Sequence, residues 1–254
     1  MPAKALEGKR AIVTGASSGM GAAIAMRFAA EGAGIWAAGG GDAEGLRATI
    51  EGCARHGVRA GGKGYSLARS QDAAQLVRDG AEFLGGLDIL VNCAGTRSFK
   101  PIVEVEDEEI DLLFQVNAKA AYLTSREAAR IMLPQKSGRI LMLGSEAGEH
   151  GTPNFSLYSC TKAVMHNLTK CLALELGPSG IRVNCLAPGV VESGRVKQLL
   201  ANDHEFADNR RNKIPIHQFG DPENMAATAL FLVSAENEFM NGSIVLTDGG
   251  TTAA

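Results

Sequence analysis

The chain lacks the features expected of a secreted, membrane-spanning or nucleic-acid-binding protein. Its 254 residues include 25 basic and 28 acidic side chains, a net charge of -3, so no basic surplus is present to attract a polyanion. Residues 1–10 are polar, and Arg27 and Glu31 interrupt the longest alanine-rich stretch. We therefore expect no secretory leader, no membrane-spanning helix and no nucleic-acid partner.

Cysteine is scarce, and its spacing suits neither a disulfide framework nor a metal site. No Cys-x-x-Cys pair and no zinc-like cluster with histidine occurs among the five cysteines, which are Cys53, Cys93, Cys160, Cys171 and Cys185. Reduced thiols and no bound metal are expected, as is usual for a cytoplasmic protein.

No proline-rich linker, internal repeat or low-complexity tract divides the chain, which favours a single domain over residues 1–254. Apolar runs alternate with longer segments of helical period, and this predicts an α/β fold with a doubly wound, seven-stranded parallel sheet covered on both faces. The expected strands are 10–14, 34–38, 59–65, 87–91, 139–143, 181–186 and 243–247. The clearest helices are 20–31, 71–84, 108–132, 157–176 and 222–234.

A glycine-rich turn follows the first apolar run. Residues 11–13 lead into Thr14-Gly15-Ala16-Ser17-Ser18-Gly19-Met20-Gly21, and an alanine-rich helical stretch comes next. Glycines allow close backbone approach, and the free N–H groups at the start of a helix attract a pyrophosphate. The segment predicts a phosphate-binding loop, although a tight turn without a ligand would have the same spacing.

Tyr158 and Lys162 lie four residues apart, which places a phenol and an ammonium on one helix face. An isolated phenol keeps its proton near neutrality and is a poor base. A cation about 4 Å away, at an effective dielectric constant near 20, favours the phenolate by about 4 kcal/mol. The pair predicts a tyrosine that exchanges a proton, unless the ring simply packs on the core and the lysine extends into water.

Together these segments resemble the short-chain dehydrogenase/reductase family in its one-domain form, over essentially the whole chain. The pieces follow the family's order: residues 14–21, Asn92-Cys93-Ala94-Gly95, Asn117, Ser145, Tyr158 with Lys162, Pro188-Gly189 and Asp248-Gly249-Gly250. Ser145 precedes Tyr158 by 13 residues, as is usual in the family. No single piece is specific, but their joint occurrence is.

The resemblance implies an enzyme that interconverts a secondary alcohol and a ketone by hydride transfer with NADP or NAD. Tyr158 would be the general acid/base, and Lys162 would support it and hold the nicotinamide ribose. Ser145 would hydrogen-bond the substrate oxygen, and Asn117 would anchor a water chain to Lys162. As structural alternatives, Ser145 could ease a turn and Asn117 could hold backbone.

The resemblance also implies which residues bind the coenzyme. They come from the glycine loop, the ends of the second to fourth strands, the catalytic pair and the segment after the sixth strand. They are Gly15, Ser17, Ser18, Gly19, Met20, Gly21, Gly39, Gly40, Ser66, Leu67, Asn92, Ala94, Gly95, Tyr158, Lys162, Pro188, Gly189, Val191 and Ser193. Asn92 could instead bridge neighbouring strands.

The segment expected to bind adenosine departs from the family pattern. Relatives that use NAD often have an acid at the end of the second strand, which binds the ribose 2′-hydroxyl and repels a 2′-phosphate; here that residue is Gly39. The positions where relatives that use NADP often have Arg or Lys are Gly40 and Ser18. Ser66 replaces a frequent adenine-binding aspartate, and Asp42 could swing back toward the ribose. The missing repulsion favours NADP over NAD.

Substrate choice is expected to depend on the loops 96–100, 146–155 and 190–219, the last being the main substrate loop. Its charges nearly balance, so a basic dock for an acyl carrier protein is not required. A 3-oxoacyl-type reductase is the first hypothesis, and a polyol or sugar dehydrogenase is the second. Arg97 would bind an anionic substrate, unless it is a solvated loop charge.

Two further function classes fit the sequence less well. A catalytically silent coenzyme-binding scaffold need not keep Asn117, Ser145, Tyr158 and Lys162 together, and related lyases or dehalogenases often replace the lysine and lose the glycine motif. The long helices 108–132 and 157–176 resemble those that form the four-helix interface of tetramers in this family, so a homotetramer is expected.

Overall fold

The structure, a computed structural model, describes residues 4–253, which contain one sheet of seven parallel strands in the order β3-β2-β1-β4-β5-β6-β7. The strands are β1 (Arg10–Thr14), β2 (Gly34–Gly39), β3 (Ala60–Gly64), β4 (Ile89–Asn92), β5 (Gly138–Leu143), β6 (Ile181–Pro188) and β7 (Ile244–Thr247). The strand order reverses between β1 and β4. A sheet of this type binds ligands at that point, beyond the carboxyl ends of its strands.

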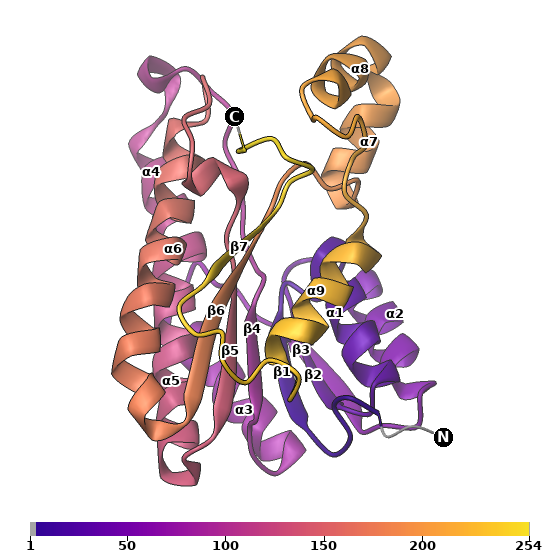
Figure 1. Ribbon diagram of the computed structural model, residues 1–254, viewed down its shortest axis with the longest axis vertical. Helices are drawn as coiled ribbons and strands as arrows, with labels where there is room; N and C mark the ends of the chain where they lie inside the picture. The colour runs from indigo at the N-terminus through magenta and orange to yellow at the C-terminus, as the bar shows by residue number, and fades with distance from the viewer. Residues whose placement is uncertain (1–3, 254) are drawn as a thin grey trace.

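Helices cover both faces of the sheet (Figure 1). One face carries α1 (Gly19–Ala30), α2 (Ala43–Ala54) and α9 (Pro222–Val233); the other carries α3 (Ser70–Leu84), α5 (Ala120–Gln135) and α6 (Ser156–Leu176). The remaining helices are α4 (Asp107–Leu113), α7 (Gly194–Asn202) and α8 (His204–Asn212). Short helical turns are η1 (Ile102–Glu104), η2 (Phe114–Lys119), η3 (Glu146–Gly148) and η4 (Gly177–Ser179).

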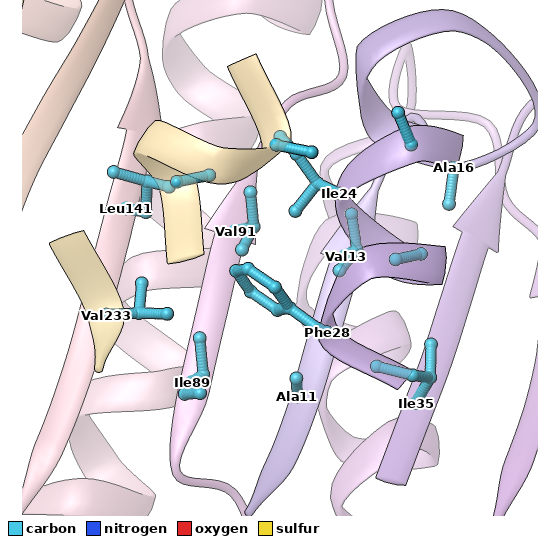
Figure 2. Packing of buried hydrophobic residues seen from close by; sticks show 14 of the residues in the cluster. Ala11, Val13, Ala16, Ile24, Phe28, Ile35, Ile89, Val91, Leu141 and Val233 are labelled. Atoms are coloured by element: carbon cyan, nitrogen blue, oxygen red, sulfur yellow. The ribbon is translucent and has the colours of Figure 1, made fainter. Parts of the chain in front are cut away.

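Strand β1 shows how the sequence produces two core layers. Ala11 and Val13 pack on the α1 and α9 side, whereas Ile12 between them packs on the opposite side. In Figure 2, Phe28 of α1 projects toward Val13 and Val91 on the adjacent strands. Because both faces of the central strands are buried, their sequences are apolar without alternation.

The predicted α/β doubly wound fold is confirmed, and each predicted strand lies within two residues of the observed bounds. The predicted helix over 108–132 is observed as one continuous helical segment made of α4, η2 and α5. The sequence did not predict that η2, between α4 and α5, is a π-helical turn, and such turns often occur at functional sites.

The substrate loop 190–219 contains two helices that its loop-like sequence did not predict. α7 and α8 stand beyond the carboxyl ends of the strands (Figure 1). A small separate cluster of Ala207, Ile214 and Phe219, with Val190 and Val196 against it, holds this region together. Within residues 4–253, no helix is both long and apolar enough to cross a membrane.

Candidate active site

A cavity of about 1090 Å³ lies at the carboxyl ends of β1, β2 and β4. It brings together residues from the glycine loop, the expected adenosine site and helix α6. The predicted site residues that line it are Gly15, Ser17, Ser18, Met20, Gly39, Gly40, Ser66, Leu67, Ala94, Gly95, Tyr158, Lys162 and Ser193. The cavity therefore brings together predicted residues from segments that lie far apart along the chain.

The glycine loop is pressed against the loop that follows β4. Gly15 has a φ of 68°, which favours glycine, and a Cβ atom on it would lie 2.8 Å from the Cα atom of Ala94. Thr14, which our prediction missed, holds the two loops together, because its hydroxyl accepts hydrogen bonds from the N–H groups of Cys93 and Ala94, both at 3.0 Å. Ser18 makes no side-chain cap on α1, so the first N–H groups of this helix stay available to an anion.

Tyr158 and Lys162 face the cavity from α6, as their four-residue spacing predicts. The Lys162 Nζ lies 5.6 Å from the centre of the Tyr158 ring, and Phe155 stacks on that ring at 4.5 Å. Lys162 is buried, with its Nζ donating a 2.7 Å hydrogen bond to the carbonyl of Leu143 at the end of β5. The ammonium keeps two further N–H groups with which to bind a ligand in the cavity.

Asn117 lies behind the cavity, in the π-helical turn, and does not line it. Its amide pairs with the backbone of Thr96 in both directions, accepting from the N–H at 2.8 Å and donating to the carbonyl at 2.7 Å. The same amide donates to the Thr161 hydroxyl at 3.0 Å. Asn117 thus fastens the loop after β4 to α6, which is the backbone-holding alternative considered from the sequence.

Ser145 is buried at the end of β5 and also lies outside the cavity lining. Its hydroxyl oxygen accepts a 3.2 Å hydrogen bond from the N–H of Ala147, which leaves the hydroxyl proton to donate elsewhere. The Asn92 side chain, by contrast, points away from the cleft. It donates to Ser125 at 3.0 Å and accepts from Thr124 at 2.6 Å, so it ties β4 to α5.

Five predicted coenzyme-binding residues remain, and at the glycines among them neighbouring backbone segments pack closely. A Cβ atom on Gly21 would overlap the carbonyl of Gly15, and one on Gly189 would lie 2.8 Å from the Cα atom of Asp248. Gly19 is left-handed, with a φ of 57°. Pro188 ends β6, and Val191 is buried and pairs with Gly220 in a short β-bridge. None of these five lines the cavity directly.

The adenosine end of the cavity has little charge. A Cβ atom on Gly39 would overlap the hydroxyl of Ser17, and that hydroxyl is buried with no hydrogen-bond partner in the described chain. Asp42 also lines the cavity, and its carboxylate caps α2 by accepting from the Gly45 N–H at 2.8 Å. Among the described residues that line the cavity, the cationic side chains are Arg97 and Lys162, at the other end.

Cys93 and Glu146 are titratable groups near the site whose pKa values are shifted. Burial, although opposed by Lys162, raises the pKa of the Cys93 thiol to about 11, so this residue is no thiolate nucleophile. Burial also raises the pKa of Glu146, next to Ser145, with His150 opposing and Asp248 adding to the rise. The Glu146 Oε2 is buried without a hydrogen-bond partner in the part of the chain that the structure describes.

Comparison with known proteins agrees with this geometry. Residues 15–252 match the family model described as enoyl-(acyl carrier protein) reductase. The chain is similar to gluconate 5-dehydrogenase of Gluconobacter oxydans (34% identity, covering 98% of this chain and 96% of that protein) and to 3-oxoacyl-[acyl-carrier-protein] reductase of Thermotoga maritima (32% identity, 96% and 98%). A short chain dehydrogenase from Burkholderia cenocepacia, solved in complex with NADP, superposes with a TM-score of 0.90 at 35% identity, covering 97% and 99% of the two chains.

The chain belongs to the short-chain dehydrogenase/reductase family. The resemblance noted in the sequence is thereby confirmed, and the protein is an NAD(P)-dependent oxidoreductase of alcohols and ketones. Sequence reasoning missed the hydroxyl of Thr14 and the carbonyl of Leu143. A backbone carbonyl leaves no trace in a sequence, but a threonine at the end of a strand before a glycine turn is a readable signal.

Proposed function

We propose that this chain reduces a ketone, or oxidises the matching alcohol, with NADP(H), using Tyr158 as the general acid/base on a single domain of residues 1–254. The observation that carries the proposal is the buried Lys162 ammonium held beside the Tyr158 ring at the inner end of the cavity. Burying an ammonium ion costs free energy, so a buried lysine is expected to have a role that offsets this cost. Stabilising a phenolate in the cleft is such a role.

The residues present fit a nicotinamide dinucleotide, which when bound supplies or accepts the hydride. The uncapped N-terminus of α1 and the close-packed Gly15 suit the pyrophosphate. At the adenosine end, Gly39 and Gly40 leave room for a 2′-phosphate, and the Asp42 carboxylate is engaged in capping α2. The structural relatives solved with NADP support NADP as the preferred coenzyme.

Each catalytic side chain then has one task. Tyr158 delivers a proton to the developing alkoxide in reduction, or removes it in oxidation. Lys162 stabilises the phenolate, and its free N–H groups bind a ribose. The Ser145 hydroxyl donates to the substrate oxygen, where negative charge grows in the transition state. Asn117 holds the Thr96 loop and α6 in register, so that these three groups converge.

A polyhydroxy acid is the substrate class we favour, with a 3-oxoacyl thioester as the alternative. Gluconate 5-dehydrogenase and 2-dehydro-3-deoxy-D-gluconate 5-dehydrogenase are among the relatives, and the cavity lining contains Arg97, a cation suited to a carboxylate. The match to the enoyl-(acyl carrier protein) reductase family and the Thermotoga relative supports the alternative.

We further propose a homotetramer in the cytoplasm. Apolar side chains on α4, η2, α5 and α6 line a hollow of about 890 Å³; Leu112, Phe114, Tyr122 and Val164 among them are exposed, and Leu168 is partly buried. Burying this hollow against the same surface of a second copy satisfies the symmetry of a closed oligomer. All five cysteines are free, which suits a reducing compartment.

The deciding experiment is a substrate panel followed by the absorbance of the reduced nicotinamide. Gluconate, 5-dehydrogluconate and acetoacetyl-CoA would each be tested with both coenzymes, using the wild type and Tyr158→Phe. We expect turnover of the sugar acids with NADP(H) and a fall in kcat of about 10²- to 10⁴-fold in the variant, with its coenzyme affinity retained. Equal turnover by Tyr158→Phe would overturn the catalytic assignment, and turnover of the thioester alone would select the alternative substrate.

A further inference from the structure

Behind the catalytic serine lies a histidine to which neither the family pattern nor the cavity assigns a role. His166 is on α6, one turn after Lys162 and two turns after Tyr158, so the three side chains follow one another on one helix face. Its side chain is only 5% exposed. Buried histidines are uncommon and generally have polar partners on both ring nitrogens.

The two ring nitrogens of His166 face the two sides of the Ser145 segment. Nε2 lies 3.5 Å from the backbone nitrogen of Ser145, at the long end of the hydrogen-bond range. Nδ1 lies 2.9 Å from Oε1 of Glu149, although the oxygen is out of line with the N–H direction, so this contact is chiefly electrostatic. A backbone N–H can only donate, so Nε2 must accept and the ring proton must sit on Nδ1, facing the carboxylate.

Glycines make the room that this ring occupies. A Cβ atom on Gly144 would overlap Nε2, and one on Gly148 would lie 2.6 Å from Cε1 of the ring. His166 is therefore wedged between the residues on either side of Ser145, in contact with the backbone that sets the direction of the serine hydroxyl. The ring is buried behind the Ser145 segment and does not line the cavity.

We propose that His166, in its neutral Nδ1–H form and oriented by Glu149, is a positioning residue that fixes Ser145 toward the substrate. The inference rests on the proposed role of Ser145 in catalysis. Protonation of the ring turns Nε2 into a donor that faces the donor N–H of Ser145. The segment after β5 then loses this hydrogen bond, and the Ser145 hydroxyl is no longer held toward the substrate.

The charged groups around His166 determine the pH at which this loss occurs. Burial lowers the pKa of His166 below its ordinary value of about 6.5, and Glu149 opposes that shift. Lys162 and Lys170 on its own helix lower it further. Cys185 of β6, which lies beside Gly144 as the ring does, stays a neutral thiol because burial raises its pKa to about 12. The ring is therefore neutral at neutral pH, and kcat should fall on the acid side of 6.5.

The test compares kcat against pH for the wild type, His166→Gln, His166→Leu and Glu149→Gln with the best substrate of the panel. Glutamine keeps a neutral acceptor near the Nε2 position but cannot be protonated, so it should retain kcat at neutral pH and lose the acid limb. Leucine keeps the volume without the acceptor, so kcat should fall about 10- to 100-fold at every pH with coenzyme affinity unchanged. Glu149→Gln should move the limb to lower pH.

Two controls separate positioning from simple packing. Thr169→Val removes a buried hydroxyl of α6 that donates to the carbonyl of Met165, and it should leave kcat and the pH profile as in the wild type. In a Ser145→Ala background, His166→Leu should cause no further loss, because the histidine acts through the serine. An additive loss there, or a wild-type profile in both His166 variants, overturns the proposal.

A direct measurement is independent of turnover. Nitrogen NMR of the ring should show His166, assigned by its absence in His166→Gln, as the Nδ1–H tautomer, with exposed His56 as a reference. An Nε2–H tautomer contradicts the proposal. If Ser145→Ala itself keeps full activity, the role of Ser145 in the proposed function fails instead, and the NMR result still decides what His166 does.

Discussion

At the residue scale, the choice of coenzyme is expected to depend on two positions of the cavity that carry no side chain. Gly39 and Gly40 stand where a charged group would select one coenzyme over the other, and they differ in what they tolerate. A Cβ atom on Gly39 meets the Ser17 hydroxyl and Leu46, whereas one on Gly40 meets nothing within 4 Å. A new charge can therefore be introduced at Gly40 without disturbing the packing.

Gly40→Asp should reverse the coenzyme preference. A carboxylate there accepts from the ribose 2′-hydroxyl of NADH and repels the 2′-phosphate of NADPH, so KM for NADPH should rise about 100-fold while that for NADH falls. Steady-state kinetics with both coenzymes measure this. Gly40→Asn has the same shape without the charge, and an equal effect of the two variants would mean that shape, not charge, is responsible.

Arg97 offers a matching prediction at the substrate end. It is exposed and lines the cavity, and its guanidinium suits a carboxylate. Arg97→Ala should raise KM about 10-fold or more for an anionic sugar acid and leave KM for a neutral ketone nearly unchanged. Arg97→Lys should recover part of the loss. Unchanged KM values for both substrates would show that Arg97 is a solvated loop charge.

At the scale of elements, an ion pair below the site joins β1 to the start of β4. Arg10 binds Asp88 through Nε at 2.7 Å and Nη2 at 2.9 Å, and its backbone N–H donates to the same carboxylate at 2.9 Å. Burial alone would raise the pKa of Asp88, but the hydrogen bond and charge of Arg10 outweigh it and lower the pKa below its ordinary value. These strands are the pair at which the sheet order reverses.

The sign of this shift gives a stability prediction. A lowered carboxyl pKa means that the stabilisation is fully present above the unfolded value of about 3.9 and is lost as pH falls through the folded value. Asp88→Asn should lower the free energy of unfolding at neutral pH by about 1–3 kcal/mol, which lowers Tm by a few degrees. The variant should also show a weaker fall of Tm with acid pH. Glu238→Gln, whose side chain is exposed, should change neither. Equal acid profiles for wild type and Asp88→Asn would contradict this.

How far the sequence sufficed also differs between elements. The strands were predictable because buried parallel strands are short apolar runs between turns, and the glycine loop and the Tyr158/Lys162 pair could be located for equally local reasons. The π-helical turn at Asn117 was not predictable, since one shifted hydrogen bond leaves the residue pattern helical. The link from His166 to Ser145 was missed because the ring meets a backbone N–H 21 residues away, and backbone groups carry no sequence signal.

At the scale of the whole molecule, the apolar hollow over α4, η2, α5 and α6 predicts the assembly. Val164→Glu would place an unpaired charge in that surface, so light scattering after gel filtration should show species below the four-chain mass of about 106 kDa, four times 26.5 kDa. Leu174→Glu, on the same helix but outside the hollow, should keep the wild-type mass. If Val164→Glu also keeps that mass, this surface is not the subunit contact.

Helix α6 carries the proposed catalytic side chains on one side and residues of the apolar hollow on the other. Val164 is exposed on the side that lines the hollow, whereas Tyr158 and Lys162 line the cavity on the other side. A neighbouring subunit braced against the back of this helix would resist any tilt that spoils the proton path. Specific activity should then decline on extreme dilution, as protomers separate, before any unfolding is detectable.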